Sequence, residues 1–206
     1  MIAVFSLMRR RQDVSLTEFQ RHWLDPHGPL VCKFPRLRRY SQNHVTGAGV
    51  TDVDGFAELA YDSDADQEAA TGSPEMAACD RDSPLFIGSV LRVVTESTEI
   101  IPYPVRTDGL AKRITVFTGD AGMAFPAQRR FAATVRQVAG VSGHVENLAL
   151  RQRGPRSAVP VLDVTVNTIV EVWFENAAAM RRAAADLDAA AGTSAKTYAV
   201  KEHRFI

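Results

Sequence analysis

The sequence has no excess of charge of either sign, because 24 Lys and Arg balance 24 Asp and Glu among its 206 residues. Proteins that bind nucleic acid gather a basic surplus on one surface, so this balance argues against a nucleic-acid partner. No apolar run approaches the length of a membrane span, and the segment Met1 to Met8 lacks the basic stretch and apolar core of a signal peptide. These absences predict a cytoplasmic globular protein with no membrane partner.

Cysteine is scarce, and the motifs that bind common cofactors are missing. Neither Cys32 nor Cys79 belongs to a CxxC pair or lies near a histidine at ligand spacing. We therefore expect neither a zinc site nor a disulfide framework. The sequence also lacks GxGxxG after a strand, the phosphate-binding pattern GxxxxGKS or GxxxxGKT, GxSxG and HExxH. We expect a protein that works without a cofactor or a metal ion.

The two halves of the chain repeat a pattern of β-rich segments. For example, Ile2 to Phe5 recurs as Ile114 to Phe117. Self-similarity at this distance predicts a tandem duplication. The turn-rich linker at 102–110 is expected to separate a first domain at 1–104 from a divergent second domain at 111–206.

Each half has the pattern of a β-α-β-β-α-β unit. Ser15 and Glu18 form a capping box that predicts a helix start, and Ser73 before Pro74 predicts another. Such a unit covers only one face of its antiparallel sheet with helices, and the sister unit can cover the other. We predict an α+β fold of two ferredoxin-like units whose sheets pack face to face within one chain. The expected strands are 2–8, 38–45, 56–61, 90–101, 114–118, 142–150, 168–174 and 196–205, the expected helices begin at 15, 65, 73, 126 and 177, and Gly47 to Gly49 is expected to be a loop.

Several segments of the first half together match a known family pattern. They are Met1 to Leu7, Leu16 to Trp23 running into Pro26 to Leu30, Leu37 to His44, Asp54 to Leu59, Ser73 to Glu75 and Val94 to Glu96. With these motifs, residues 1–101 resemble the EthD domain of the dimeric α/β-barrel superfamily. The second half is similar only in its strand pattern and in its ending Glu202-His203, like a divergent copy.

The resemblance implies a small-molecule protein of bacterial catabolic or polyketide pathways, with relatives that include a cofactor-independent muconolactone methylisomerase. We expect an isomerase, cyclase or lyase that transfers a proton on an oxygenated, ring-containing acid or lactone. The implied assembly is a monomeric pseudo-dimer or a homo-oligomer of it. Two alternatives stay open: a non-catalytic ligand-binding or accessory protein of an oxygenase pathway, and a cofactor-independent monooxygenase.

His27 is the first candidate for catalysis, because an imidazole can accept and return a proton near neutral pH. Tyr40 matches a tyrosine of the family pattern, which implies that its hydroxyl binds a substrate oxygen or helps to move the proton. Phe19 and Trp23 lie four residues apart on one helix face and are expected to wall the site. A structural role stays an alternative for each polar group. Ala139 stands in the second half where His27 stands in the first, so we expect the principal pocket in the first half.

Further candidates for substrate binding come from the strands. His44 shares a strand face with Tyr40, because side chains alternate with a period of two. His144 takes the place of Tyr40 in the second half, and with Trp173 it is expected to close the site.

Glu58 and Glu171 recur in the middle of otherwise apolar strands. An ionised carboxylate in such a place is costly unless it is paired. We expect Arg92 or Lys201 as the partner, and an inter-sheet salt bridge stays an alternative to substrate binding by Glu58.

Overall fold

A computed structural model describes residues 1–46 and 52–206 of the chain. The expected loop Gly47 to Gly49 lies outside these residues. Contacts divide the chain into two compact units. Unit 1 contains Met1–Glu96, Leu150–Asp163 and Glu202–Ile206, and unit 2 contains Ser97–Ala149 and Val164–Lys201.

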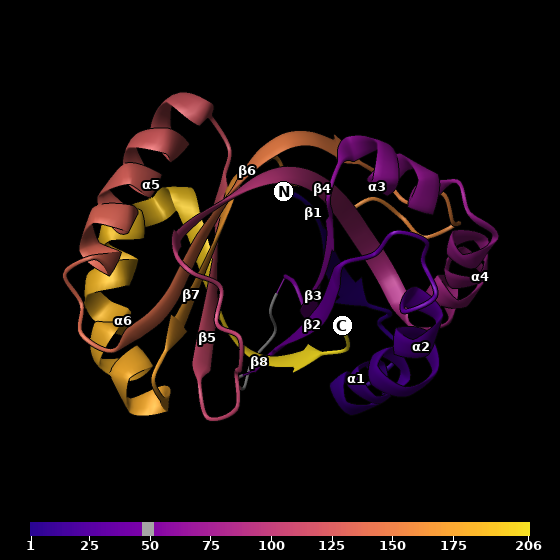
Figure 1. Cartoon of the computed structure of the whole chain (residues 1–206), viewed down its shortest axis with the longest axis horizontal. Coiled ribbons are helices and arrows are strands. Elements are labelled where there is room, and N and C mark those ends of the chain that lie inside the picture. The colour runs from indigo at the N-terminus through magenta and orange to yellow at the C-terminus, as the bar shows by residue number, and fades with distance from the viewer. Residues whose placement is uncertain (47–51) are drawn as a thin grey trace. The chain divides into compact units, whose positions relative to one another are not determined.

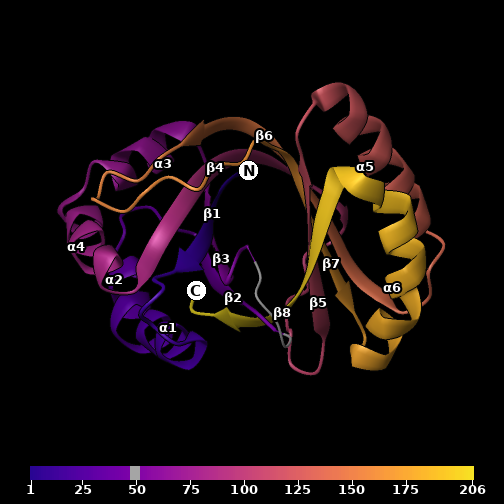
Figure 2. The same ribbon diagram turned by 180° about the vertical axis from the view of Figure 1, so that it is seen from behind.

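The sheet of unit 1 has the strand order β4-β1-β3-β2, and all its neighbours are antiparallel. The helices of this unit pack on one face of the sheet, as the two views in Figures 1 and 2 agree. The elements are β1 (Ile2–Arg10), α1 (Leu16–His22), a π-helical turn (Trp23–His27), α2 (Gly28–Val31), β2 (Arg39–Val45), β3 (Gly55–Tyr61), α3 (Asp64–Thr71), α4 (Pro74–Asp82), a 3₁₀ turn (Ser83–Leu85) and β4 (Ile87–Ile101).

Two helix starts in unit 1 follow from local sequence chemistry. The Ser15 side chain accepts a hydrogen bond from the backbone N–H of Glu18, and the Glu18 carboxylate accepts one from the backbone N–H of Ser15. Ser73 caps α4 in the same way through the N–H of Met76, with Pro74 at the first helical position. Both predicted helix starts are confirmed, because a cap satisfies backbone donors that the first turn leaves free.

Unit 2 contains a second antiparallel sheet, in the order β6-β7-β5-β8. α5 and α6 lie side by side on one face of it (Figures 1 and 2). The elements are β5 (Ala111–Thr118), α5 (Ala121–Val135), β6 (Val141–Arg153), β7 (Val166–Phe174), α6 (Ala177–Ala191), a 3₁₀ turn (Gly192–Ser194) and β8 (Ala195–Arg204).

α5 starts earlier than its sequence predicted. Pro126 was expected to open the helix, but the helix begins at Ala121 with Pro126 inside it. Ala121 and Ala124 favour a helical first turn. Pro126 is the sixth residue of the helix, where it removes the one backbone bond that its N–H would make to the Gly122 carbonyl.

Each unit thus combines helices with an antiparallel four-stranded sheet. The α+β class with antiparallel strands is therefore confirmed. The division at 1–104 and 111–206 stays a prediction. No described helix is long and apolar enough to cross a membrane.

Residues Leu150–Asp163, here called the strap, belong to unit 1 although they come late in the chain. The strap is the orange segment that passes α3 in Figures 1 and 2. It is fixed to β4 by backbone hydrogen bonds from Val90 N–H to Pro160 O at 3.0 Å and from Leu162 N–H to Val90 O at 3.2 Å.

Candidate functional site

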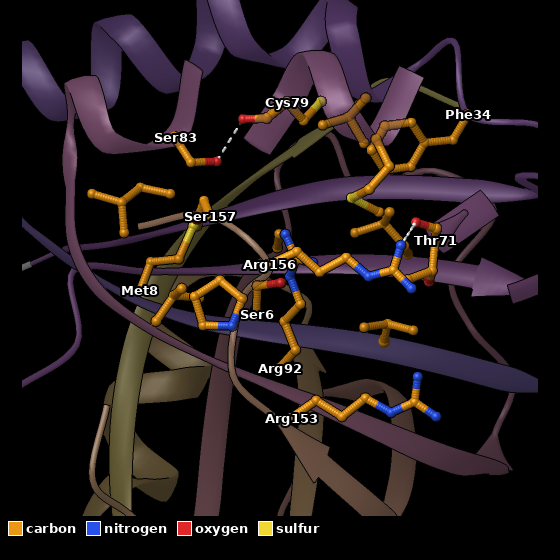
Figure 3. A pocket seen from close by; sticks show the side chains of 18 of the residues that line it. Ser6, Met8, Phe34, Thr71, Cys79, Ser83, Arg92, Arg153, Arg156 and Ser157 are labelled. Atoms are coloured by element: carbon orange, nitrogen blue, oxygen red, sulfur yellow. Dashed lines mark hydrogen bonds between the residues drawn. The ribbon is translucent and has the colours of Figure 1, made fainter. Parts of the chain in front are cut away.

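A cavity of about 110 Å³ lies in unit 1 between the sheet and the helices. Side chains of Met8, Phe34 and Cys79 are among those that line it (Figure 3). This volume is below the roughly 150 Å³ of an apolar cavity known to hold benzene, so a ligand enclosed here has at most one small ring.

His27 lines this cavity at the end of the π-helical turn. Pro26 has no N–H to continue the regular helical ladder, and the N–H of Gly28 reaches five residues back to the Trp23 carbonyl. π-Turns of this kind are frequent at functional sites. The turn is continuous with α2, so the helix widens locally at Pro26 and does not end there.

Asp82, at the end of α4, holds the His27 ring. The Nδ1 atom of His27 lies 2.8 Å from Oδ2 of Asp82, and the His27 side chain is 9% exposed. His22 Nε2 lies 3.1 Å from the other oxygen, Oδ1, of the same carboxylate. A carboxylate bonded to Nδ1 fixes the ring orientation and leaves Nε2 as the nitrogen for proton exchange.

The electrostatics of Asp82 favour the ionised form. Burial alone raises the pKa of this carboxyl, but the hydrogen bonds from His27 and His22 outweigh it and hold the pKa below its ordinary value. The carboxylate is therefore charged at neutral pH and can stabilise an imidazolium on His27. The sequence analysis did not identify Asp82, since no local pattern connects α4 with the π-helical turn.

Hydrogen bonds join Tyr40, Gln42 and His44 on one face of β2, a set here called the Gln42 row. The Gln42 Nε2 donates to the Tyr40 hydroxyl and to the Trp23 carbonyl, both at 2.7 Å, and His44 Nε2 lies 2.9 Å from Gln42 Oε1. A carbonyl can only accept, so the amide nitrogen faces Trp23 and the amide oxygen faces His44. His44 therefore carries its proton on Nε2. The strand face predicted to be shared by Tyr40 and His44 is confirmed, and Gln42 lies between them on it.

Tyr40 lines the cavity and is fully buried, and its hydroxyl accepts from Gln42. Burial raises the pKa of Tyr40 well above its ordinary value. The phenol therefore stays protonated and keeps its O–H for donation. This group can donate to a substrate oxygen, and it is unsuited to act as an ionised base at neutral pH.

The aromatic candidates differ in their contact with the cavity. Trp23 lines it and stacks on His44 with ring centroids 4.5 Å apart. Its indole also packs against Gly55, where an added Cβ would clash with it. Phe19 lies behind, 5.6 Å from Trp23 and 5.5 Å from Phe86, and is not among the lining residues. Phe19 supports the wall that Trp23 forms.

Glu58 lies on the opposite face of the sheet from Tyr40. In the β2–β3 register Tyr40 pairs with Leu59 and Ser41 with Glu58, so successive residues face opposite sides. Glu58 accepts from Arg39 Nη2 at 2.7 Å and from Ser41 Oγ at 3.1 Å. It does not line the cavity.

The expected partners of the two strand glutamates were wrong. Glu58 pairs with Arg39, and Arg92 instead pairs with Asp80 at 3.2 Å. Glu171 pairs with Lys112, with Nζ to Oε1 at 2.7 Å. In both cases the partner comes from an adjacent paired strand, where the register brings the two side chains together.

His144 and Trp173 belong to unit 2 and do not line the cavity. The β6–β7 register pairs Gly143 with Trp173 and His144 with Val172, which puts His144 and Trp173 on opposite sheet faces. The structure therefore does not bring these two candidates together. Trp173 lies under Lys112, whose Nζ is 4.3 Å from the ring centroid.

No group of three or more His, Cys, Asp or Glu within residues 1–46 and 52–206 has the arrangement to hold a metal ion.

Residues 11–89 match the family model of the EthD domain. The matched range contains Trp23, His27, Tyr40 and Asp82. The EthD resemblance predicted for the first half is confirmed. No curated protein matches the chain.

Several solved structures share the fold over nearly the whole chain. An anthrone oxidase-like protein is 14% identical with a TM-score of 0.68, over 98% of this chain and 92% of that one. A Fusobacterium nucleatum protein provisionally named a monooxygenase is 8% identical with a TM-score of 0.62, over 98% and 91%. A mutant chlorite dismutase from Candidatus Nitrospira defluvii is 10% identical with a TM-score of 0.52, over 97% and 91%. At these identities the likeness concerns the fold alone.

Proposed function

From the premise that the chain contains an EthD domain, we propose that this domain is a cofactor-independent enzyme that transfers protons. Its reaction is an isomerisation, cyclisation or elimination on an oxygenated, ring-containing acid or lactone. The ring occupies the cavity of unit 1, and His27 takes a proton from one atom of the substrate and returns it to another.

The observation that carries this proposal is the pair of His27 and Asp82 at the wall of an apolar cavity. The 2.8 Å contact at Nδ1 orients the imidazole, and the carboxylate offsets the positive charge that the ring gains when Nε2 takes a proton. Apolar walls limit the water around the reacting atoms, which strengthens the attraction between the Asp82 carboxylate and an imidazolium at His27.

Tyr40 has the complementary role in this proposal. Removal of a proton next to a carbonyl leaves negative charge on the carbonyl oxygen, and a protonated phenol can donate to it. Gln42 donates a hydrogen bond to the Tyr40 hydroxyl oxygen, so the O–H of Tyr40 points away from Gln42. His44 and Trp23 position this row, and they contribute to the site through Gln42 and through the cavity wall.

We extend the proposal to the architecture. The second half is a divergent copy of the first, the domains are 1–104 and 111–206, and the protein acts as a monomeric pseudo-dimer or a homo-oligomer of it in bacterial small-molecule catabolism. Within this scheme His144 and Trp173 have structural roles, because they lie on opposite faces of the unit 2 sheet.

Two other functions use the same cavity. A cofactor-independent monooxygenase would begin with the same proton removal, and a ligand-binding or accessory protein would use the cavity without chemistry. The structures named above as oxidase-like and monooxygenase support the former through their fold only.

The experiment is deuterium exchange in D₂O with a panel of ring-containing oxo acids and lactones, followed by proton NMR. We expect loss of a substrate C–H signal with the native protein and a decrease of about 10²- to 10⁴-fold in the His27→Ala variant. Asp25→Asn is the matched control, since Asp25 is an exposed residue of the same turn.

Full exchange by a folded His27→Ala protein would overturn the proton-transfer role. Binding of panel compounds without exchange would favour the ligand-binding alternative, and oxygen consumption with the same compounds would favour the monooxygenase.

A further inference from the structure

The charged side chains that line the cavity are cationic. Three arginines, Arg92, Arg153 and Arg156, are among the described residues that line it, and none of those lining residues is Asp or Glu. In Figure 3 the three arginine side chains lie on the side of the cavity away from Cys79 and Ser83. The cavity therefore has a positively charged region beside its apolar walls.

Two of these arginines come from the strap and not from the EthD domain. Both lie outside residues 11–89: Arg153 is the last residue of β6, and Arg156 lies on the segment that follows it. Arg151 anchors the strap to α3 through an ion pair with Asp64 and a 3.1 Å hydrogen bond to Gln67. The later half of the sequence thus supplies charged groups to a cavity built by the earlier half.

The arginines differ in how far their charge is neutralised. Arg92 pairs with Asp80 at 3.2 Å, while Arg153 and Glu68 are 3.7 Å apart with largely exposed side chains. Arg156 donates from Nη1 to the Thr71 carbonyl at 3.0 Å, and no described carboxylate lies within ion-pair distance of it. A carbonyl orients the guanidinium without neutralising it, so Arg156 keeps a full positive charge.

We propose that the cavity selects an anionic ligand, a small ring that carries a carboxylate, and that Arg156 and Arg153 of the strap bind this carboxylate. The inference rests on the proposed function and deepens it, because it favours the acid over the neutral lactone. Guanidinium donors form a planar fork that matches a carboxylate. The ring fills the apolar space, and the charged end stays at the strap.

The test is a ligand-observed NMR titration with benzoate and its neutral counterpart benzamide. We expect benzoate to bind native protein about tenfold more tightly than benzamide, with a preference that weakens in high salt. Arg156→Gln combined with Arg153→Gln is expected to remove this preference and to leave benzamide affinity within about twofold, because only the charged contact is lost.

Arg38→Gln is the matched control. Arg38 forms an exposed ion pair with Asp62 in unit 1 and does not line the cavity, so the benzoate preference should persist in this variant. Equal binding of benzoate and benzamide, an unchanged preference in the double variant, or no benzoate binding up to its solubility limit would overturn the inference.

The benzoate titration and the exchange assay of His27→Ala together separate this inference from the proposed reaction. If exchange chemistry proves independent of His27 but the benzoate preference and its loss in the strap variant persist, the anion site stands and the proton-transfer role falls. If His27 is required for exchange but the preference is absent, the reverse holds.

Discussion

The Nδ1 atom of His27 lies 2.8 Å from Oδ2 of Asp82, although 55 positions separate the two residues in the chain. His22 holds the other oxygen of the same carboxylate at 3.1 Å. Asp82 is therefore fixed from two sides, and it fixes the His27 ring in turn. This arrangement makes Asp82 a positioning residue for the proposed proton transfer.

Asp82→Asn should lower the rate of proton exchange by about 10²-fold or more, because an amide can donate to Nδ1 and so favour the wrong tautomer of His27. Benzoate affinity should change little, since Asp82 does not line the cavity. Exchange rates and titrations of the same preparations measure both quantities. A parallel loss of binding and rate, with lower thermal stability, would instead indicate a structural role.

Tyr40→Phe should lower the exchange rate by about three- to tenfold, the equivalent of one hydrogen bond of about 0.5–1.5 kcal/mol, and by more if the bond forms to a developing oxyanion. The ring keeps its stacking on Phe205, with centroids 4.9 Å apart. Tyr61→Phe is the comparison, because Tyr61 lines the same cavity from β3 outside the Gln42 row. Equal effects of the two substitutions would contradict a specific role for the Tyr40 hydroxyl.

The sequence predicted those parts of the site that depend on local geometry. The two-residue period of a strand placed Tyr40, Gln42 and His44 on one face, and the four-residue spacing of a helix paired Phe19 with Trp23. Such relationships follow from backbone repeats alone. They required no knowledge of the tertiary fold.

The remaining parts depend on long-range register and were missed. Asp82 reaches His27 only because α4 packs near the π-helical turn, and Arg156 reaches the cavity only because the strap crosses α3. The Glu58 partner was wrong for the same reason, since several cations were compatible with the pattern and only the β2–β3 register selects Arg39.

Glu58→Gln should lower the free energy of unfolding by about 3–5 kcal/mol, because it leaves the half-buried Arg39 without its carboxylate in the sheet. Exchange activity per folded molecule should persist, since Glu58 faces away from the cavity. Asp62→Asn, which breaks the exposed pair with Arg38, should cost about 0–1 kcal/mol. Urea unfolding measures both. A normally folded Glu58→Gln protein without activity would return Glu58 to the substrate site.

His144 should make stability depend on pH. It is fully buried, and neither ring nitrogen has a hydrogen-bond partner within the described chain. Burial, assisted by the nearby Arg136, lowers the pKa of His144 to about 4. Below about pH 6.5, His144 binds a proton in the unfolded chain but stays neutral in the folded chain. The native state therefore loses stability as the pH falls from about 6.5 to 4.

We expect the free energy of unfolding of the native protein to fall by about 1–3 kcal/mol across that range. His144→Leu removes the difference in proton binding and should make this decrease smaller. At pH 7 the substitution should be close to neutral, because it deletes no hydrogen bond and keeps an apolar group of similar size in the core. Glu146→Gln is the control. Glu146 lies 3.5 Å from His144, and burial raises the pKa of its carboxyl, so this group stabilises the folded state as the pH falls and its removal should not flatten the loss. Urea unfolding at intervals from pH 7 to pH 4 gives the comparison. Parallel pH profiles for native protein and His144→Leu would show that the acid sensitivity does not come from this imidazole.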